Sequence, residues 1–475
     1  MKQHQLAILL LLIAIIGMVV FYQYPTMLEL PPQGAHIWRQ SDCMAMTQNY
    51  QQFHISFFQP ATYNLQSVNG NVAGEFPVFY FIAAQFKNPV FALRLMHSII
   101  FLLGIISTYF IAFYFLQRRL LSLFCAVFMF TSPLLVFYGN NFLSDVPALG
   151  FAFIGWAIFL HHYKNEIIVG LFIAFFCFAF AALLKASEAI HFAIAFIFIL
   201  RNKKTSVKIL IPYIVMLLPL LWYFFAKSYN KTNHDTYYFL SIFPVWKLSL
   251  NDIGLAIWRM VVSNSRYYFW LPTTILFIIS IYFLLKNRKK MEKELSTLLS
   301  CSLIISTIYL VLFYQKMIAH EYYYVPFFST VLFVIIGILK IYNSYHAENI
   351  FMHTFAYTFL VLNIIYCKKT VVEKLTIPMY NGYLSSEEMQ FFLDKNGVTN
   401  DKSIVSLPDD TPNKTLFQLK RKGYTEFNNY IDVLKNKKAD YIIIGYKDVV
   451  NREELKPFLI NKIDSFHDIT LYKLK

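Results

Sequence analysis

Two residues in the segment HIWRQSDCMAMTQN (36–49) could do chemistry together. Arg39 and Asp42 are three positions apart, so on a helix they lie about one turn apart. A carboxylate that accepts a hydroxyl proton beside a guanidinium that holds a phosphate would give this pattern. A purely structural interpretation also fits, in which Ser41 or Asp42 caps an interfacial helix. Arg39 would then reach lipid phosphate and Trp38 would lie among the headgroups.

Three further polar groups stand at the ends of apolar stretches. They are Asp145 in GNNFLSDVPAL, Lys185 and Glu188 in LLKASEAIH, and His320 with Glu321 in IAHEYYYVP. A charge at the mouth of a membrane helix is costly to desolvate without a partner or a water-filled cavity. Because these groups come from separate turns of the chain and Asp42 adds a fourth, the pattern predicts one polar cavity.

The elements that must position these residues are apolar helices. Of the 475 residues, 57% are hydrophobic and 15% are charged, and the mean hydropathy is +0.48. Soluble domains carry about 25% charged residues, so a soluble globular protein and a disordered chain are both excluded. Eleven stretches are candidate spans, the sixth of them short: 6–22, 91–116, 120–138, 143–160, 167–184, 189–200, 207–226, 269–285, 296–314, 323–341 and 350–367.

The net charge of +15 first suggests a nucleic-acid partner, but its distribution indicates membrane topology. With the N-terminus inside, the inner loops hold 14 of the 24 Lys and Arg residues of positions 1–367, and the short outer turns hold only Lys185 and Lys316. This asymmetry follows the positive-inside rule and removes the nucleic-acid interpretation. It predicts a cytoplasmic N-terminus, long outer loops at 23–90 and 227–268, and an extracytoplasmic C-terminal part. In a bacterium the membrane would be the inner membrane, and in a eukaryote the outer side would be the ER lumen.

The C-terminal part has a different composition. Residues 368–475 hold 18 basic and 15 acidic residues. Short β-rich runs at 403–407, 441–445 and 469–474 alternate with amphipathic stretches at 385–396 and 427–438. This alternation predicts a small α/β domain. The domain organisation is therefore a polytopic α-helical membrane domain at 1–367 followed by an extracytoplasmic α/β domain at 368–475.

Several short motifs occur in a fixed order along the chain. HIWRQSD is followed by GEFPVFYF with ALRLMHSII, then SPLLVFYGNNFLSDVPAL, ALLKASEA and HEYYYVP. In this order, and on one predicted side of the membrane, they resemble the GT-C superfamily of membrane glycosyltransferases, of the bacterial protein O-mannosyltransferase and lipid A aminoarabinose transferase type. The resemblance covers most of residues 1–345.

The resemblance implies an integral membrane enzyme that moves a sugar from a polyprenyl-phosphate donor to an acceptor hydroxyl on the outer face, usually with inversion. It places the chain in cell-envelope chemistry, either lipopolysaccharide or protein glycosylation, with a lipid, glycan or protein acceptor. Asp42 matches the catalytic acid and would be the general base, Asp145 matches a second acid, and Lys185 matches the lysine that faces the donor phosphate. Many members carry Glu where this chain has Cys43, so the role of that Glu is either dispensable or supplied elsewhere, by Glu75 or Glu188.

The remaining site residues follow from the chemistry of such a transfer. A departing phosphate needs a positive cradle, for which Arg39, Lys185 and His320 are candidates. Tyr322 and Tyr323 would contact the sugar or the lipid tail, or else belong to an interfacial aromatic belt. The supporting polar cavity is expected to include His36, Trp38, Gln40, Glu75, Asn141, Asp145, Glu188 and Glu321.

The tail contains one more candidate, the stretch LPDDTPNKTLFQLKRKGYT, which resembles a segment in the tails of some bacterial members of the superfamily. Either its Asp/Pro/Asn turn only caps a basic helix at 413–422, or Asp409, Asp410 and Asn413 face the cavity and help to choose the acceptor.

No resident cofactor is expected, because the chain has no Walker A or dinucleotide motif and no zinc spacing. A divalent cation is the one candidate, held by some of His36, Asp42, Asp145, His191, His320 and Glu321. A disulfide between Cys43 and Cys367 is a further alternative.

Two other functions fit a polytopic protein with charged helix ends. A transporter or flippase of lipid-linked sugars would show internal repeats and charges near the bilayer midplane, and neither pattern is found here. A polysaccharide polymerase or ligase would carry an Arg/His-rich outer loop, and His234, Arg259 and Arg266 in the loop 227–268 keep that alternative open.

Overall fold

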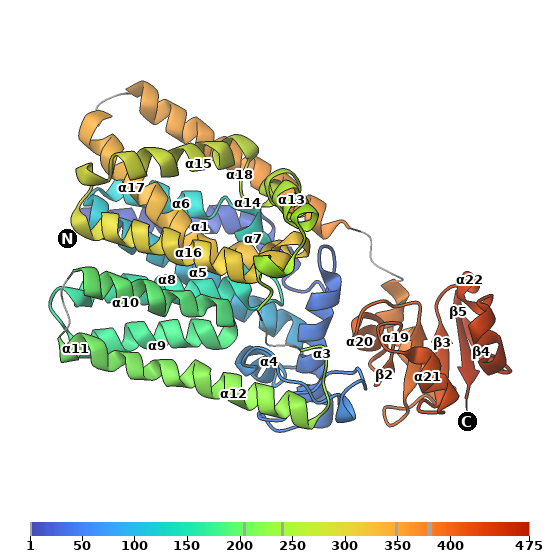
Figure 1. Ribbon diagram of the computed structural model, residues 1–475. Helices are drawn as coiled ribbons and strands as arrows, with labels where there is room; N and C mark the ends of the chain where they lie inside the picture. The colour runs from blue at the N-terminus through green and yellow to red at the C-terminus, as the bar shows by residue number, and fades with distance from the viewer. Residues whose placement is uncertain (1, 203–205, 239–241, 347–349, 378–381, 475) are drawn as a thin grey trace. The chain divides into compact units, whose positions relative to one another are not determined.

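The computed structural model describes residues 2–202, 206–238, 242–346, 350–377 and 382–474 (Figure 1). The chain forms two compact units, each assembled from three separate segments. The first unit comprises Met1–Leu28, Arg94–Trp222 and Ser241–Lys374, and the second comprises Glu29–Leu93, Tyr223–Leu240 and Leu375–Lys475. The second unit thus joins the predicted C-terminal domain to most of the first outer loop. The predicted domain boundary at residue 367 stays a prediction.

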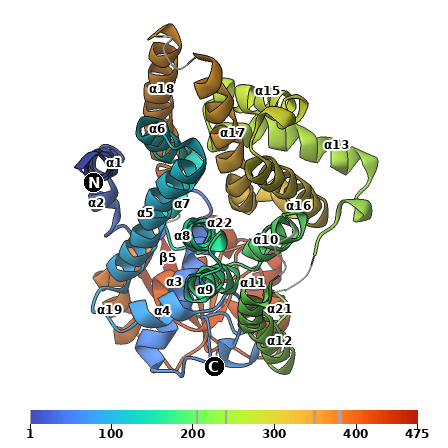
Figure 2. The ribbon, with the colours of Figure 1, turned by 90° about the vertical axis from the view of Figure 1, so that its left-hand side faces the viewer.

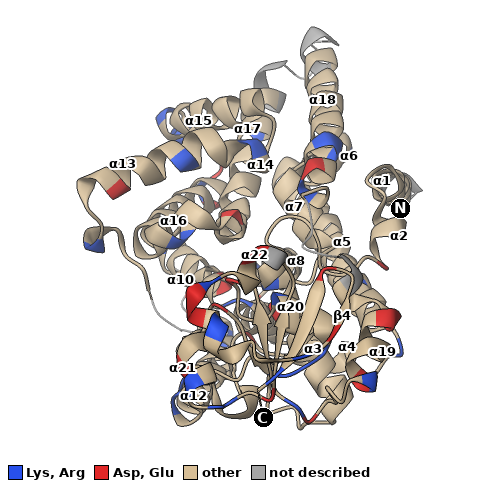
Figure 3. Cartoon of the chain, turned by 90° about the vertical axis from the view of Figure 1, so that its right-hand side faces the viewer, with Lys and Arg blue, Asp and Glu red and all other residues tan. Residues whose placement is uncertain are grey.

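The first unit is helical. Its described helices, some of which begin or end in the second unit, are α1 (Lys2–Phe21), α2 (Tyr24–Met27), α5 (Pro89–Leu116), α6 (Arg119–Met129), α7 (Pro133–Gly139), α8 (Asp145–Tyr163), α9 (Ile168–Leu184), α10 (Ile190–Arg201), α11 (Val207–Leu210), α12 (Leu217–Thr232), α13 (Leu250–Trp258), α14 (Ser265–Tyr268), α15 (Leu271–Lys286), α16 (Lys293–Ala319), α17 (Phe328–His346) and α18 (Ile350–Leu375). Two short 3₁₀ helices, η2 (Ala186–Ala189) and η7 (Glu321–Phe327), matter for the site. Figure 3 shows few charged residues along the long helices α15, α16 and α17.

The chain is a multi-pass membrane protein, because six stretches of helix among the described residues are long and apolar enough to cross a bilayer. These are Pro89–Leu116, Asp145–Tyr163, Val207–Thr232, Lys293–Ala319, Glu321–Tyr342 and Thr354–Leu375. Each coincides with a predicted span. Four more predicted spans fall on the shorter helices α1, α9, α10 and α15. The count of eleven spans and the orientation stay predictions.

The predicted span 120–138 is a bent pair of helices, α6 and α7, with an angle of 71° between them. The sequence Thr-Ser-Pro explains the break. Pro133 occupies the first turn of α7, where its missing N–H costs nothing, and it restricts the preceding residue to an extended conformation. Ser132 is the N-cap, and its hydroxyl accepts a hydrogen bond from the Leu135 amide at 3.5 Å. A new helix therefore begins at Pro133 in another direction.

Helices α8 and α9 form the part of the first unit that positions charged residues. They are joined by a short turn at 164–167 and pack against each other, as Figure 2 shows in a view near their axes. Gly155 permits this close approach, because a Cβ there would lie 2.7 Å from the Phe178 ring and 3.0 Å from the Ala174 carbonyl oxygen. Two helices joined in this way run antiparallel, so the first residue of α8 and the residue after α9 lie at the same end.

The second unit is an α/β assembly. Its described helices of four or more residues with α geometry are α3 (Ile37–Phe53), α4 (Val78–Ala83), α19 (Glu387–Lys395), α20 (Lys414–Leu419), α21 (Tyr430–Lys435) and α22 (Lys447–Val450). Its sheet has the order β2-β1-β3-β5-β4, from β1 (Ile404–Leu407), β2 (Gly423–Tyr424), β3 (Tyr441–Ile444), β4 (Asn461–Phe466) and β5 (Ile469–Lys473). β1 pairs in parallel with β2 and β3, whereas β5 is antiparallel to β3 and β4. The three predicted strands and the predicted α/β character are confirmed.

The burial of this sheet explains why strands β1 and β3 could be predicted from the sequence. Every residue of β1 and of β3 is buried, as expected for parallel strands covered on both faces. Residues Val405, Leu407, Ile442 and Ile444 pack with Val433, Leu434, Ala439, Val449, Leu455 and Tyr472.

The segment 23–90, the predicted first outer loop, extends the edge of this sheet. The Gly423 amide in β2 donates to the Tyr63 carbonyl at 2.9 Å, and the Leu65 amide donates to the Gly423 carbonyl at 2.8 Å. Asn64 and Gly423 are thereby partners in a parallel bridge. Only glycine fits at this position, because a Cβ would lie 2.0 Å from the Ile404 carbonyl oxygen. Two segments about 360 residues apart in the sequence are thus hydrogen-bonded through their backbones.

Candidate functional site

Helix α3 carries Arg39 and Asp42 within the second unit. The helix begins at Ile37, after His36 in a left-handed conformation (φ 53°), and no side chain caps it. Asp42 therefore lies in the second turn, and the expectation that Ser41 or Asp42 caps this helix is wrong. Asp42 is 1% exposed, so its carboxylate must be satisfied by protein groups. This removes the purely structural interpretation of the residue as a helix cap.

The Asp42 carboxylate accepts hydrogen bonds from three directions. Its Oδ1 accepts from the Asn413 amide nitrogen at 2.8 Å, and its Oδ2 accepts from the Tyr237 hydroxyl at 3.0 Å. The Arg39 guanidinium lies 3.5 Å from Oδ2. These donors come from three segments of the second unit, namely α3, the segment 223–240 and the start of α20. The site is therefore built by tertiary structure around one buried acid.

The Arg39 guanidinium is also paired with a second acid. Its Nη2 donates to both oxygens of Glu75 at 2.7 Å, and it lies 5.7 Å from the ring centre of Tyr238. The Tyr80 hydroxyl donates to Glu75 at 2.7 Å and lies 3.3 Å from the Cys43 sulfur. Glu75 is thus linked to Cys43 through the Tyr80 hydroxyl. Of Glu75 and Glu188, the two acids predicted as replacements for a glutamate at position 43, the second unit contains Glu75.

Burial and the neighbouring charges bring the pKa of Asp42 close to neutral pH. Burial raises the pKa of Asp42 to about 6, while Arg39 and the hydrogen bonds from Asn413 and Tyr237 act in the opposite direction. The carboxylate of Glu75 adds a small further rise. Attraction to Glu75 and to other nearby groups holds the pKa of Arg39 well above its usual value, so the guanidinium stays charged. A carboxylate with a pKa near 6 is ionised at pH 7 and is a stronger base than an exposed aspartate.

A local turn orients Tyr237 and Tyr238 toward Asp42 and Arg39. The Asp235 carboxylate accepts from the backbone amides of Tyr237 at 3.3 Å and Tyr238 at 2.8 Å, which is an Asx-type turn. The Asn230 side chain exchanges hydrogen bonds with the backbone of Ala73 and also donates to the Tyr238 carbonyl. This turn therefore follows directly from the residues Asn-His-Asp-Thr-Tyr-Tyr.

The other predicted residues of the first loop have structural contacts. The Gln40 amide donates to the carbonyls of Gln33 and Ala35, both at 2.8 Å, and so fixes the turn before α3. The rings of His36 and Trp38 form an edge-to-face pair with centres 6.4 Å apart. The hydrogen bonds of Gln40 therefore support the loop that holds the site.

A second charged cluster lies within the first unit. Asp145 is the first residue of α8 and forms an ion pair with Lys185, which follows α9, at 2.8 Å. A carboxylate at a helix N-terminus is also favoured by the helix dipole. The Lys185 ammonium lies 5.3 Å and 5.1 Å from the ring centres of Tyr322 and Tyr323, within range of cation–π attraction. The three predicted turns of this unit therefore meet, since the antiparallel pair α8–α9 brings two of them together and η7 adds the third.

Glu188, His191 and Trp156 form a fully buried chain in the same unit. The indole nitrogen of Trp156 donates to His191 Nδ1 at 2.9 Å, and His191 Nε2 lies 2.8 Å from Glu188 Oε2. Because indole can only donate, Nδ1 must be the acceptor, so Nε2 carries the proton and donates to Glu188. Burial raises the pKa of Glu188, while the hydrogen bond from His191 opposes that rise. His191 is thereby held in one neutral tautomer.

Glu321 takes part in a third group of polar contacts, which the sequence did not predict. It forms a buried ion pair with Lys374 in the last turn of α18. The Tyr138 hydroxyl of α7 donates to the same Glu321 oxygen at 2.9 Å. The ring of His320 stacks on that of Tyr322 with centres 5.4 Å apart. Lys374 had been assigned to the C-terminal domain on composition, and its burial beside an acid becomes evident only in the folded chain.

Asn141 and the Tyr138–Asn141 turn are held by neighbouring helices of the first unit. The Asn141 carbonyl lies 2.9 Å from His97 Nδ1, and its side chain accepts from the Phe142 amide. The buried Arg94 donates to the Asn140 carbonyl and lies 4.2 Å from the Phe142 ring centre. Asn141 thus stabilises the turn that precedes Asp145.

Sequence reasoning missed Tyr237, Tyr238, Lys374 and Trp156, and it assigned Asn413 to a different role. The Tyr-Tyr pair beside Asp235 in a predicted outer loop was the one available signal for the first two. Asp409, by contrast, accepts hydrogen bonds from Thr411 and Thr415 and pairs with Lys414 at 3.7 Å. Asp410 is exposed.

The described residues contain no group of three or more His, Cys, Asp and Glu side chains that could hold a metal ion. The proposed convergence of His36, Asp42, Asp145, His191, His320 and Glu321 on a divalent cation therefore finds no support in this structure. All five cysteines, which are among the described residues, are free thiols, so the disulfide between Cys43 and Cys367 is wrong.

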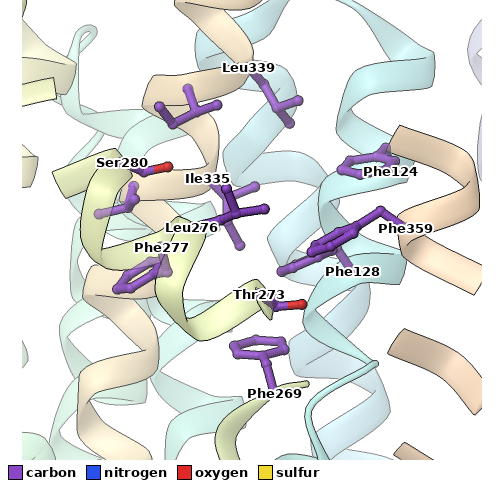
Figure 4. Close-up of a pocket in the computed structure, with 12 residues that line it drawn as sticks. Phe124, Phe128, Phe269, Thr273, Leu276, Phe277, Ser280, Ile335, Leu339 and Phe359 are labelled. Atoms are coloured by element: carbon purple, nitrogen blue, oxygen red, sulfur yellow. The ribbon is translucent and has the colours of Figure 1, made fainter. Parts of the chain in front are cut away.

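An apolar cavity of about 130 Å³ opens in the first unit (Figure 4). Five phenylalanines (Phe124, Phe128, Phe269, Phe277 and Phe359) and aliphatic residues line it, with Thr273 and Ser280 as its polar residues. The Thr273 hydroxyl already donates to Asn363 at 2.8 Å. With no titratable group in its lining, this cavity can hold hydrocarbon and carries no acid–base chemistry.

No protein-family model matches the sequence. No curated protein matches it in sequence. The fold, in contrast, has close counterparts among solved structures. ArnT from Cupriavidus metallidurans in the apo state has a TM-score of 0.63 at 10% identity, over 97% of this chain and 98% of that chain. The same protein bound to undecaprenyl phosphate has a TM-score of 0.61 at 10% identity, over 100% and 98% of the two chains.

Two other solved structures share the fold. The arabinofuranosyltransferase AftD from Mycobacteria has a TM-score of 0.59 at 11% identity, over 98% of this chain and 40% of that chain. The oligosaccharyltransferase from Archaeoglobus fulgidus, in a complex with Zn and sulfate, has a TM-score of 0.58 at 10% identity, over 90% and 67% of the two chains. The chain therefore shares the fold of these solved structures, in agreement with the fold that the order of its motifs implied. At these identities the likeness establishes the fold alone.

Proposed function

We propose that the chain is a membrane glycosyltransferase that moves a sugar from a polyprenyl-phosphate donor to an acceptor hydroxyl. The buried Asp42 cluster carries this proposal. A carboxylate that is 1% exposed and has a pKa of about 6 is costly for the fold, and it is suited to removing a proton near neutral pH. The GT-C fold and the likeness to a structure that binds undecaprenyl phosphate support the choice of donor.

In the proposed reaction Asp42 is the general base. It takes the proton of the acceptor hydroxyl while the oxygen of that hydroxyl attacks the anomeric carbon. The bond between the anomeric carbon and the phosphate oxygen breaks, its electron pair leaves with the polyprenyl phosphate, and the configuration at the anomeric carbon inverts. Because phosphate is a good leaving group, the donor needs charge stabilisation more than protonation.

Lys185 is the proposed ligand of the donor phosphate. The Lys185 side chain is 19% exposed, and its ammonium is fixed by Asp145, with Tyr322 and Tyr323 around it. Lysine binds phosphate as a point charge, so the ion pair with Asp145 fixes its position without changing its chemistry. One nitrogen of Arg39, Nη2, donates to both oxygens of Glu75, which favours a role in holding Asp42 ionised over the predicted role in binding phosphate.

The proposal is tested with the purified protein in detergent and a panel of polyprenyl-phosphate pentoses and hexoses. Release of polyprenyl phosphate is measured with and without membrane glycolipid, oligosaccharide and peptide acceptors. We expect acceptor-dependent release by the wild type and at least a hundredfold loss in Asp42→Asn, the scale of a missing general base. Asp401→Asn, which changes an exposed carboxylate of the same unit, is the matched control. Equal release by Asp42→Asn and the wild type would overturn the assignment of the base.

A further inference from the structure

Asn413 connects the C-terminal part of the second unit to the proposed base. Its side chain is fully buried, and its amide nitrogen donates to Asp42 Oδ1 at 2.8 Å across 371 positions of sequence. Its amide oxygen accepts from the backbone N–H of Asn64 at 3.0 Å. Both ends of the amide are thus occupied, and this settles its orientation: the oxygen faces a donor and the nitrogen faces an acceptor.

A second layer of amides holds Asn413 and Asn64 together. The Asn64 side chain donates to the Pro412 carbonyl at 2.7 Å and to Asn428 at 3.0 Å, and Asn428 donates back to Asn64 at 3.1 Å. The backbone bridge between Asn64 and Gly423 lies in the same region. Asn413 is therefore clamped between the first outer loop and the edge of the sheet, and it has little freedom to turn away from Asp42.

The remaining groups around Asp42 show what this amide adds. Helix α3 presents Arg39 and Cys43, and the first loop and α4 present Glu75 and Tyr80. The segment 223–240 presents Tyr237 and Tyr238. On α20 the neighbouring charge, Lys414, is paired with Asp409 at 3.7 Å. Among the described residues, the donors to Asp42 are thus a tyrosine and an arginine on Oδ2 and the Asn413 amide on Oδ1.

An amide nitrogen has a distinct chemical effect at this position. It can donate but never accept, so its hydrogen bond to the ionised carboxylate is stronger than its hydrogen bond to the protonated acid, and it favours the ionised form. A carboxylate has about four lone-pair sites. With Oδ2 holding Tyr237 and Arg39 and Oδ1 holding Asn413, one site on Oδ1 is left for a substrate proton.

We propose that Asn413 is a positioning residue of the glycosyl transfer proposed above: it fixes the Asp42 carboxylate in one rotamer, keeps it ionised, and so makes the C-terminal α/β segment part of the active site. The inference rests on the proposed function for its kinetic consequence. The effect on the titration of Asp42 does not depend on that function, which allows the two to be tested separately.

The decisive variant is Asn413→Asp. It keeps the shape of the side chain and the acceptor for the Asn64 amide, but it replaces the donor to Asp42 with a second carboxylate. A hydrogen bond to a charged group contributes enough to move a pKa by about one to two units, and the added negative charge increases the effect. We expect the acidic midpoint of kcat/KM to move from about 6 to 7 or above, with kcat reduced near pH 7, KM for the donor unchanged, and activity recovered at alkaline pH.

Two further variants separate chemistry from folding. Asn413→Leu removes the donor without adding charge, so its midpoint should lie between those of the wild type and Asn413→Asp. Arg421→Lys loosens the same C-terminal segment, where Arg421 ties Asp394 to the Val398 carbonyl, but it has no contact with Asp42. Its midpoint should equal that of the wild type even where its total activity is lower. Equal midpoints for the wild type and both Asn413 variants would overturn the proposal.

An infrared titration measures the protonation of Asp42 in the absence of any substrate. The carboxyl band that is lost in Asp42→Asn identifies the residue, and its midpoint should rise in both Asn413 variants. If this band shifts while no donor is turned over by the wild type, the glycosyltransferase function fails and the positioning role stands. If the wild type is active and the band does not shift, the positioning role fails and the function stands.

Discussion

Replacing Arg39 with glutamine should move the pH dependence of the enzyme to a higher pH. The Arg39 guanidinium lies 3.5 Å from Asp42 Oδ2 and 2.7 Å from both oxygens of Glu75. Its removal takes away the cation nearest to the base and leaves the Glu75 carboxylate without that cation. Both changes favour the protonated form of Asp42, so both raise its pKa. Since the base must be ionised to act, activity should require a more alkaline solution.

The size of the shift follows from the geometry. Two unit charges 3.5 Å apart at an effective dielectric constant of about 20 attract each other by about 5 kcal/mol, which is an upper bound of about 3.5 pKa units. Water that reaches the Arg39 side chain, which is 15% exposed, reduces this value. A shift of about 2 units would move the midpoint from about 6 to about 8 and lower the rate at pH 7 about tenfold.

The assay is the pH profile of kcat/KM for polyprenyl phosphate release, with the double variant Arg39→Gln/Glu75→Gln as the matched control. The double variant removes the ion pair as a whole, so its midpoint should return toward that of the wild type. A tenfold loss that is equal at every pH would refute the electrostatic argument and favour the predicted contact of Arg39 with the donor phosphate. A midpoint unchanged within about 0.3 unit in a fully active single variant would refute both.

Three other predictions concern stability and binding. Above pH 6, Asp42→Asn should be more stable than the wild type by about 1–3 kcal/mol and should therefore unfold at a higher temperature. The folded state binds the Asp42 proton more tightly than the unfolded chain does, so the stability that the protonated group provides is lost as the pH rises through about 6. The two proteins should melt alike near pH 4, and a lower melting temperature at pH 7.5 would contradict this sign. Lys374→Met should cost about 3–5 kcal/mol because it leaves Glu321 buried without its cation, whereas Lys374→Met/Glu321→Leu should recover most of that loss in thermal melts. Lys185→Met should weaken binding of a short-chain polyprenyl phosphate at least tenfold in a titration followed by intrinsic fluorescence, and unchanged affinity would remove Lys185 from the phosphate site.

Much of the fold could be predicted from the sequence because its signals are local. A continuous apolar run is visible in the sequence itself, so the helices lie where the eleven stretches indicated. The buried strands β1 and β3 have runs such as IVSL and YIII, which are short, β-branched and uninterrupted by charges. The bend between α6 and α7 was missed although Pro133 marks it, because the apolar pattern continues through that residue. The start of α3 was missed because His36 lies in a left-handed conformation without a capping side chain.

The candidate site was predictable in part. Arg39 and Asp42 are neighbours on one helix, so their spacing was sufficient to bring them together. Asp145, Lys185, Tyr322 and Tyr323 were recognised as charged or aromatic residues at helix ends, where burial without a partner is unfavourable. Their meeting in the first unit depends on the antiparallel packing of α8 with α9, which a short turn makes probable from sequence.

The chain's own sequence determined its membrane class, its apolar helices, its α/β tail and the identity of the acid and cation on α3. Only the tertiary structure decided what surrounds that acid. Tyr237 lies 195 positions from Asp42 and Asn413 lies 371 positions from it, and no local pattern encodes a contact over such separations. The physical reason is burial: a carboxylate that loses its water must find donors wherever the fold supplies them, and those donors set its proton affinity. The tertiary structure therefore turns an ordinary aspartate into a base with a pKa of about 6.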